Sequence, residues 1–181
     1  WWIFPILLIV LFIVYKQFKK TNIGEYRIDY MKLRIPLFGQ LLHKIAISRF
    51  VRALGIIIGG GVPINHALRV SQDVCGNRVI RDAILEAERR IIAGSNLYQP
   101  LEDSGLFPSI ITQMVATGEE SGNLDTMLIG AADQLDQEID YKVKKITVLL
   151  EPILTIFLGG IVMFIALSLY LPIFNLVKVI R

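Results

Sequence analysis

Hydrophobic and polar residues divide the chain into three stretches. Residues 1–15, WWIFPILLIVLFIVY, carry no charge, and residues 152–177 carry none either. Between them, apolar residues recur every three or four positions, which is the spacing of helices that bury one face. No segment alternates strongly enough at period two to indicate a strand. The pattern predicts an all-α protein in which an antiparallel helical bundle is flanked by two apolar segments.

Breaker and capping residues divide the bundle into about six helices. Pro63 and Pro108 suit a first helical turn, Asn77 suits an N-cap, and Gly122 suits the left-handed residue that ends a helix. The predicted helices cover 37–58, 63–74, 78–93, a short segment capped by Ser95 or Asn96 and ending at Leu101, 108–121, and a last helix from Leu124 that meets no breaker before Pro152. Residues 21–38 are expected to form a connector, because Gly24 and Pro36 break any long helix.

The last predicted helix has an apolar side and an acidic side. Its expected buried stripe is Leu124, Leu128, Ala131, Leu135, Ile139 and Val143, and the four residues expected largely opposite are Asp125, Asp133, Asp136 and Asp140. Seven acidic residues and no Lys or Arg occur from Glu119 to Asp140. Such a run usually forms a solvated face. A contact surface for a partner is the alternative.

The two apolar ends are predicted to cross a membrane. A helix needs about 20 apolar residues to do so, which the second segment supplies. Residues 1–15 reach only about 22 Å and are interpreted as a span clipped at its outer end. A signal peptide carries its positive charges in front of the apolar core, whereas here Lys16, Lys19 and Lys20 come after it.

The basic residues indicate how the chain is oriented. Four Lys or Arg lie within 16–27 and three within 142–145, while only Lys178 and Arg181 follow the second segment. The positive-inside rule therefore places the bundle in the cytoplasm. The expected domains are a span at 1–15, a juxtamembrane connector at 16–36, a cytoplasmic bundle at 37–145, a span at 146–177 and a short non-cytoplasmic tail at 178–181.

Composition supports a membrane protein and gives no indication of an enzyme. Hydrophobic residues make up 54% and charged residues 19%, and the net charge of +3 comes with basic residues near the membrane, so we expect no nucleic-acid partner. The single Cys75 excludes an internal disulfide and fits a reducing compartment. GGGVP lacks the Gly-Lys-Ser/Thr of a phosphate-binding loop, and His43 and His66 have no Cys or His at ligand spacing. We expect no catalytic residues, no cofactor and no metal site.

An adjacent pair of carboxylates marks the end of the helix predicted at 108–121. Glu119 and Glu120 lie in its last turn, where the helix dipole disfavours a negative charge by about 0.3–1 kcal/mol. Either they lean toward the positive end of the following helix, or a partner's cation, a bound ion or an interdomain arginine balances them. The interface candidates are Gly118, Glu119, Glu120, Gly122, Asp125, Asp133, Asp136 and Asp140.

A second carboxylate lies just inside the C-terminal apolar segment. Glu151 is followed by Pro152, which frees a carbonyl and predicts a bend. Thr147, Glu151, Thr155 and Gly159 recur every four residues, a polar and small stripe typical of packed membrane helices. We expect this stripe and Pro152 to contact another membrane helix. The alternative is that Glu151 extends to the membrane interface.

Several motifs in a fixed order resemble the C-terminal half of the type II secretion F and type IV pilus assembly platform family. The matching elements are SRFVRAL, GVPINHAL, GNRVIRDAI, GSNLYQPLEDSGLFPSIITQMVATGEESGNLDTML and LLEPILTIFLGGIVMFIALSLYLPIF, over residues 37–175. The most specific positions are Phe107-Pro108, Gly118 to Gly122 with Leu124, and Glu151-Pro152. GIIIGGGVP is richer in glycine than the leucine-rich helix end usual before the GVP element, which leaves the end of that helix open.

The resemblance implies a non-enzymatic platform in the bacterial inner membrane. Family members carry two copies of a cytoplasmic helical domain and three spans, and this chain would hold the second span, the second copy and the third span. The resemblance implies a homodimer or higher oligomer that contacts a hexameric cytoplasmic ATPase. It also implies that the motion of the ATPase passes to pilins or pseudopilins entering or leaving a filament. The residues alone leave one alternative, a transporter or channel subunit with Glu151 as an ion or proton site.

Overall fold

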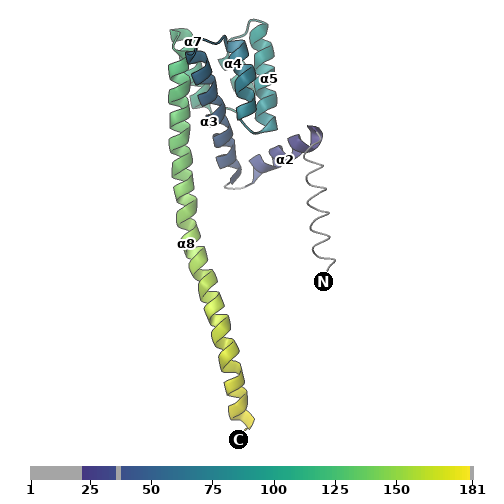
Figure 1. Cartoon of the computed structure of the whole chain (residues 1–181), viewed down its shortest axis with the longest axis vertical. Coiled ribbons are helices and arrows are strands. Elements are labelled where there is room, and N and C mark those ends of the chain that lie inside the picture. Colours follow the sequence, from purple (N-terminus) through teal and green to yellow (C-terminus); the bar gives the residue numbers. More distant parts are fainter. Residues whose placement is uncertain (1–21, 36–37, 180–181) are drawn as a thin grey trace. The chain divides into compact units, whose positions relative to one another are not determined.

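The computed structural model describes residues 22–35 and 38–179, and these residues form helices without any strand (Figure 1). In chain order the elements are α2 (Asn22–Arg34), α3 (Phe38–Gly59), α4 (Ile64–Ser71), the 3-10 helix η1 (Gln72–Val74), α5 (Arg78–Ile92), α6 (Tyr98–Asp103), α7 (Ser109–Ser121) and α8 (Leu124–Val179). The all-α class is confirmed for this part of the chain. The span expected at residues 1–15 lies outside it.

Most predicted helices are present because their end signals are local. The Asn77 side chain accepts hydrogen bonds from the backbone N–H groups of Val79 (3.0 Å) and Ile80 (3.3 Å) and so caps α5. Pro63 and Pro108 directly precede α4 and α7. The carbonyl oxygen of Pro63 accepts a hydrogen bond from the backbone nitrogen of Ala67 at 2.9 Å, as the residue before a helix does. The capping residues thus set these boundaries to within a residue or two.

The connector predicted at 21–38 is wrong, because residues Asn22–Arg34 form the helix α2. Gly24 lies in the first turn of α2, and Pro36 comes after its last residue, so neither interrupts it. The inward side of α2 is also fixed by a contact distant in sequence. Asp29, which is buried, accepts a hydrogen bond from the backbone N–H of Arg78 at 2.9 Å. Gly24 is therefore accommodated within α2, which packs against the start of α5 through Asp29.

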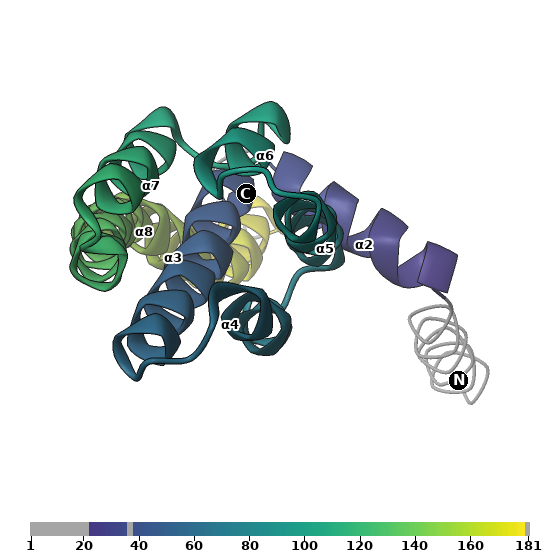
Figure 2. The same cartoon turned by 90° about the horizontal axis from the view of Figure 1, so that it is seen from above.

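The chain divides into two compact units, the first ending at Ile139 and the second beginning at Asp140, and α8 contributes residues to both. In the first unit, α3 lies between α4 and α5 on one side and α7 and the green first part of α8 on the other (Figure 2). Its core includes Ile47, Phe50, Leu54, Leu68, Ile80, Ile84, Leu97, Leu101, Ile111, Leu128 and Leu135. The rings of Phe50 and Phe107 pack with centroids 5.8 Å apart.

The buried stripe predicted on α8 is confirmed in its first part and wrong at its end. Leu128, Ala131 and Leu135 are buried, whereas Val143 is 44% exposed. Val143 comes after the boundary at Ile139, so it lies outside the first unit and its core. The expected stripe therefore extends about one turn too far.

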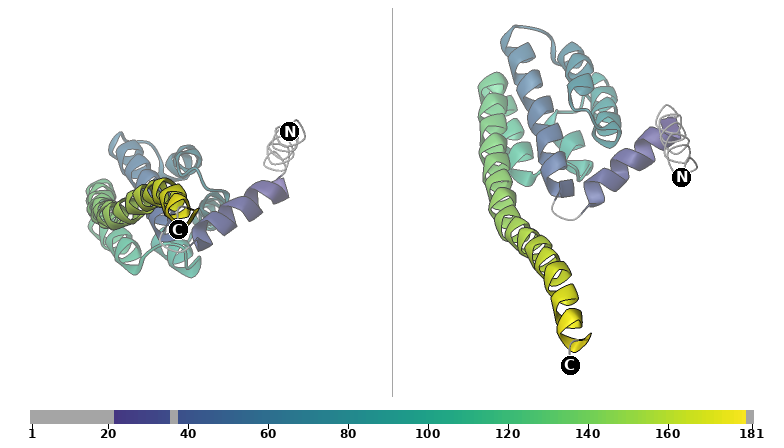
Figure 3. Two further views of the ribbon diagram at one scale, coloured as in Figure 1. Left: turned by 90° about the horizontal axis from the view of Figure 1, so that it is seen from below. Right: turned by 60° about the horizontal axis from the view of Figure 1, so that its bottom comes forward.

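The second unit contains the apolar part of α8, which is drawn as one uninterrupted helix from green to yellow (Figure 3). Within the described residues, α8 is the one helix whose length and composition suit a membrane span, and its most apolar window has no buried residue. Pro152 lies inside this helix. The bend expected there stays a prediction.

Candidate functional site

The junction between α7 and α8 depends on two glycines. Gly122 ends α7 with φ = +72°, the left-handed conformation predicted for it. Gly118 is buried, and a Cβ atom at this position would lie 2.9 Å from Cα of Leu124. The carbonyl oxygen of Gly118 accepts backbone hydrogen bonds from Gly122 and, at 3.1 Å, from Asn123. The two glycines thus allow α8 to start directly against the last turn of α7.

The side chain of Glu119 caps a helix distant in sequence. Its two carboxylate oxygens accept the backbone N–H groups of Leu97 at 2.7 Å and of Tyr98 at 3.1 Å. These are donors at the start of α6, which has no side-chain cap from its own N-cap residue. The expectation that Ser95 or Asn96 caps α6 is therefore wrong. Glu119 leans toward α6 and not toward α8.

The two neighbouring glutamates have different surroundings. Glu119 is half-buried and its oxygens are bonded to α6, whereas Glu120 is exposed, as are the turn residues Ser121 to Asn123. The hydroxyl of Ser121 donates back to the carbonyl of Thr117 at 2.7 Å. Of the pair, Glu120 is the carboxylate presented to solvent.

The acidic side of α8 is paired with polar side chains of α3. Arg52 donates to Asp133 at 2.8 Å and to Asp136 at 2.6 Å, and the Ser48 hydroxyl donates to Asp136 at 2.5 Å. Lys44 forms an ion pair with Glu138. Hydrogen bonds from Arg52 to Asp133 and then Asp136 raise the pKa of the guanidinium. The aspartate side chains nevertheless remain 58% and 48% exposed, so this face is both solvated and partly neutralised.

The interface candidates do not form one cluster. Gly118, Glu119 and Gly122 meet at the α7–α8 junction, while Asp133 and Asp136 lie against α3. Asp125 is half-buried at the start of α8, and Asp140 is exposed in the second unit. In residues 22–35 and 38–179, no group of three or more His, Cys, Asp and Glu side chains is arranged to hold a metal ion.

The polar stripe predicted on the apolar part of α8 is exposed. Thr147 donates to the carbonyl of Val143 and Thr155 to that of Glu151, each at 3.0 Å, so both hydroxyl protons are used within the helix. Glu151, Pro152 and Gly159 are exposed as well. The stripe is therefore accessible, and its contact with another helix stays a prediction.

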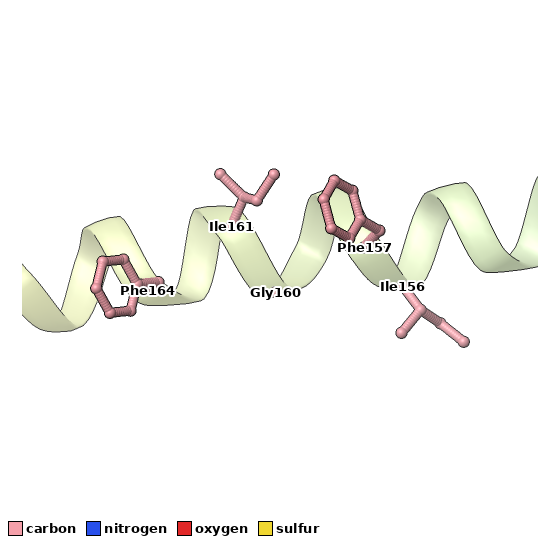
Figure 4. Close-up of a pocket in the computed structure, with 5 residues that line it drawn as sticks. All are labelled: Ile156, Phe157, Gly160, Ile161 and Phe164. Carbon is pink, nitrogen blue, oxygen red and sulfur yellow. The ribbon is translucent and has the colours of Figure 1, made fainter. Parts of the chain in front are cut away.

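An apolar recess lies on the apolar part of α8 and is lined in part by Gly160 (Figure 4). Its lining side chains are Ile156, Phe157, Ile161 and Phe164, and Figure 4 shows them projecting from a single helix. Sequence reasoning missed Gly160. The signal was present, because Phe157 and Phe164 stand three residues before and four residues after it.

Sequence reasoning also missed the α3 partners of the acidic side. Lys44, Ser48 and Arg52 recur every four residues on a mostly apolar helix, and Glu138, Asp136 and Asp133 face them from α8. A polar stripe of this kind on a core helix indicates a polar partner helix. It could have been found by comparing the two helices.

The fold of the described residues places the protein among all-helical bundles whose last helix continues as an exposed apolar helix. The chain belongs to the family described as type II secretion system (T2SS), protein F, whose profile matches residues 50–172. This confirms the resemblance found in the sequence.

Named relatives come from both pilus and secretion machines. The chain is 42% identical over 153 residues to the type IV pilus assembly protein PilC of Myxococcus xanthus, covering 84% of this chain and 37% of that protein. It is 39% identical over 176 residues to the type IV pilus assembly protein PilC of Thermus thermophilus, covering 96% and 43%. It is 36% identical over 144 residues to type II secretion system protein F of Pseudomonas aeruginosa, covering 80% and 36%. The chain thus spans less than half the length of each.

Proposed function

We propose that the chain is part of a non-enzymatic platform that couples a cytoplasmic assembly ATPase to the insertion and extraction of pilins or pseudopilins. The observation that carries this proposal is the position of α8. Its first part supplies Leu128 and Leu135 to the core of the bundle, and its later part is an exposed apolar helix. One helix thereby belongs both to a folded domain and to a segment suited to lipid. The names of the pilus and secretion relatives support the same role.

The proposed location is the bacterial inner membrane, with more than one span and the bundle in the cytoplasm. The apolar window of α8 has no buried residue, which a lipid environment would explain. Basic residues within 16–27 and 142–145 flank the bundle and favour the cytoplasmic side. Residues 1–15 would supply the other span.

The proposed partners touch different parts of the chain. The ATPase is expected at the bundle, where Glu120 and the adjoining turn are exposed at the end of α7. A second copy of the chain, pilins and other inner-membrane components are expected at the stripe of Thr147, Glu151 and Gly159. A membrane helix with small residues on one face permits close approach of another helix.

The first test is purification of the tagged full-length protein from gently solubilised native membranes, with mass spectrometry of the proteins that remain bound. We expect an assembly ATPase and at least one pilin or pseudopilin among them. The identity of these partners would also separate a pilus from a secretion machine. Recovery of the protein without any such component, at normal abundance, contradicts the proposal.

A second candidate function is a transporter or channel subunit, favoured by the exposed carboxylate of Glu151 within the apolar part of α8. A charge inside a membrane is costly and often marks an ion or proton path. Gradient-dependent flux in reconstituted vesicles that is lost in Glu151→Gln would favour transport. The platform role predicts that neither form carries flux.

A further inference from the structure

Helix α2 has two chemically distinct sides. Its exposed residues are Tyr26, Arg27, Tyr30, Met31 and Arg34. At about 100° per residue these five positions fall within one arc of about 140°. Every other residue from Gly24 to Leu33 is buried or half-buried. These five residues form the outer face of α2.

The acidic residues of α2 point toward the bundle. Asp29 is 5% exposed and accepts hydrogen bonds from the backbone N–H of Arg78 at 2.9 Å and from Lys32 at 2.8 Å. Glu25 lies 3.8 Å from the guanidinium of Arg78. Because both carboxylates face α5, the outer face contains two arginines and no acid. Its charge is positive although the helix as a whole contains both signs.

The outer face is also aromatic and apolar. The rings of Tyr26 and Tyr30 stack with centroids 6.4 Å apart, and the guanidinium carbon of Arg34 lies 4.6 Å from the Tyr30 ring centre. Met31 is 61% exposed, and just beyond the helix Phe38 is 52% exposed. Tyrosines and arginines with a few exposed apolar side chains suit the zone where lipid headgroups meet acyl chains.

The length of the chain before α2 restricts what can cover this face. Only six residues, 16–21, separate the apolar segment 1–15 from Asn22, the start of α2. Six extended residues reach about 20 Å at most. If residues 1–15 cross the membrane, α2 begins close to the bilayer surface. Three of these six residues are lysines, which favour an anionic surface further.

We propose that the outer face of α2 lies on the cytoplasmic surface of the bilayer and binds anionic lipid headgroups. Arg27 and Arg34 contact phosphate groups, and Met31 and the tyrosine rings enter the interfacial layer. On the inner side, the hydrogen bond between Asp29 and the backbone N–H of Arg78 then links this membrane-bound helix to α5 and the bundle. This placement rests on the proposed membrane insertion of residues 1–15.

The test measures how deeply single positions lie in vesicles that contain the full-length protein. Met31→Cys and Ile92→Cys carry a nitroxide label whose collisions with oxygen and with a water-soluble nickel complex are compared. Ile92 is a matched control, because it is 65% exposed and lies about 20 Å along α5 from Arg78. Cys75 is 3% exposed, and burial raises the pKa of its thiol, so the added cysteine is labelled preferentially.

A third label, at Met163→Cys in the apolar part of α8, reports membrane insertion independently. In vesicles containing phosphatidylglycerol we expect label 163 in the hydrocarbon, label 31 at the interface and label 92 in water. Label 31 in water while label 163 is in hydrocarbon overturns the lipid contact but leaves insertion intact. Labels 31 and 163 both in water overturn the contact together with the insertion on which it rests.

The role of anionic lipid is tested with charge variants of the labelled protein. Arg27→Gln with Arg34→Gln should return label 31 to the accessibility seen in purely zwitterionic vesicles. Arg89→Gln, whose side chain is 76% exposed on α5, is the matched control and should change nothing. An unchanged label 31 in the double variant overturns the headgroup contact.

Discussion

Glu119 and Glu120 are adjacent in the sequence, but their side chains have different surroundings and interactions. Glu119 accepts two backbone N–H groups at the start of α6, and one of them belongs to Leu97, which is fully buried. A buried N–H group without a partner is costly. A carboxylate also interacts favourably with the positive end of a helix. Glu120 has solvent around it.

Glu119→Gln is therefore expected to reduce the free energy of unfolding by about 1–3 kcal/mol, because it removes the charge and one of the two acceptor oxygens. Glu120→Gln should leave it unchanged within error. Denaturant unfolding of the detergent-solubilised full-length protein, followed by circular dichroism, measures both. Equal stability of the two variants would contradict the capping role of Glu119.

His43 makes the stability of the bundle depend on pH. Burial, opposed by a hydrogen bond with the Leu106 backbone, lowers the pKa of His43 below 6.5. Between that folded value and about 6.5 the unfolded chain binds more protons, so stability is complete above about pH 6.5 and is lost as the pH falls toward the folded pKa. His43→Gln should make the free energy of unfolding depend less on pH between pH 7 and 5. His66→Gln, at an exposed position, should retain the slope.

At the scale of elements, a glycine on α3 allows α3 and the first part of α8 to pack closely. A Cβ atom on Gly55 would lie 3.0 Å from Cβ of Leu128, whereas one on Gly59 would meet Asp125 at 3.5 Å, an ordinary contact. Gly55→Ala should therefore reduce the free energy of unfolding by about 1–3 kcal/mol. Gly59→Ala should be neutral or slightly stabilising, since alanine favours a helix. Thermal unfolding of the two variants distinguishes these effects, and a neutral Gly55→Ala would show that the helices can separate freely.

The elements that the sequence predicted well have their end signals within a few residues. Asn77 caps α5 through Val79 and Ile80, and Gly122 ends α7 by its own backbone conformation. The failures involve distant residues. The cap of α6 comes from Glu119, more than twenty residues later, and α2 is fixed through Asp29 by the start of α5.

Of the candidate site, the end of α7 was predictable and the contacts made there were not. Gly122 was predicted correctly as the left-handed residue that ends α7, because a glycine after a helix is a local signal. The interface role of Gly118 and Glu119 stays a prediction. That Glu119 faces α6 depends on packing. Likewise, the pairing of Asp136 with Ser48 and Arg52 joins residues more than eighty positions apart.

At the scale of the whole molecule, surface and membrane contacts predict separable defects. Glu120→Lys reverses an exposed charge without changing the cap of α6, so it should weaken co-purification of the assembly ATPase and leave stability unchanged. A pull-down from cells measures the co-purification.

Glu151→Leu should abolish filament or pseudopilus assembly at normal protein levels, because the polar stripe of α8 loses its carboxylate. This is measured by assembly in cells. Normal assembly in Glu151→Leu would rule out the proposed packing role of this residue.

The cap that Glu119 provides has a further consequence for amide hydrogen exchange. The amide protons of Leu97 and Tyr98 are hydrogen-bonded to Glu119, so their protection from exchange depends on the position of the end of α7. Their exchange rates therefore report on the neighbouring turn at Gly122 from a separate segment of the chain. A partner that pulls on Glu120 would speed deuterium uptake at residues 97 and 98, whereas one that clamps the turn would slow it. Exchange at these two backbone amides thus reports changes at the α7–α8 junction without a chemical probe on the protein.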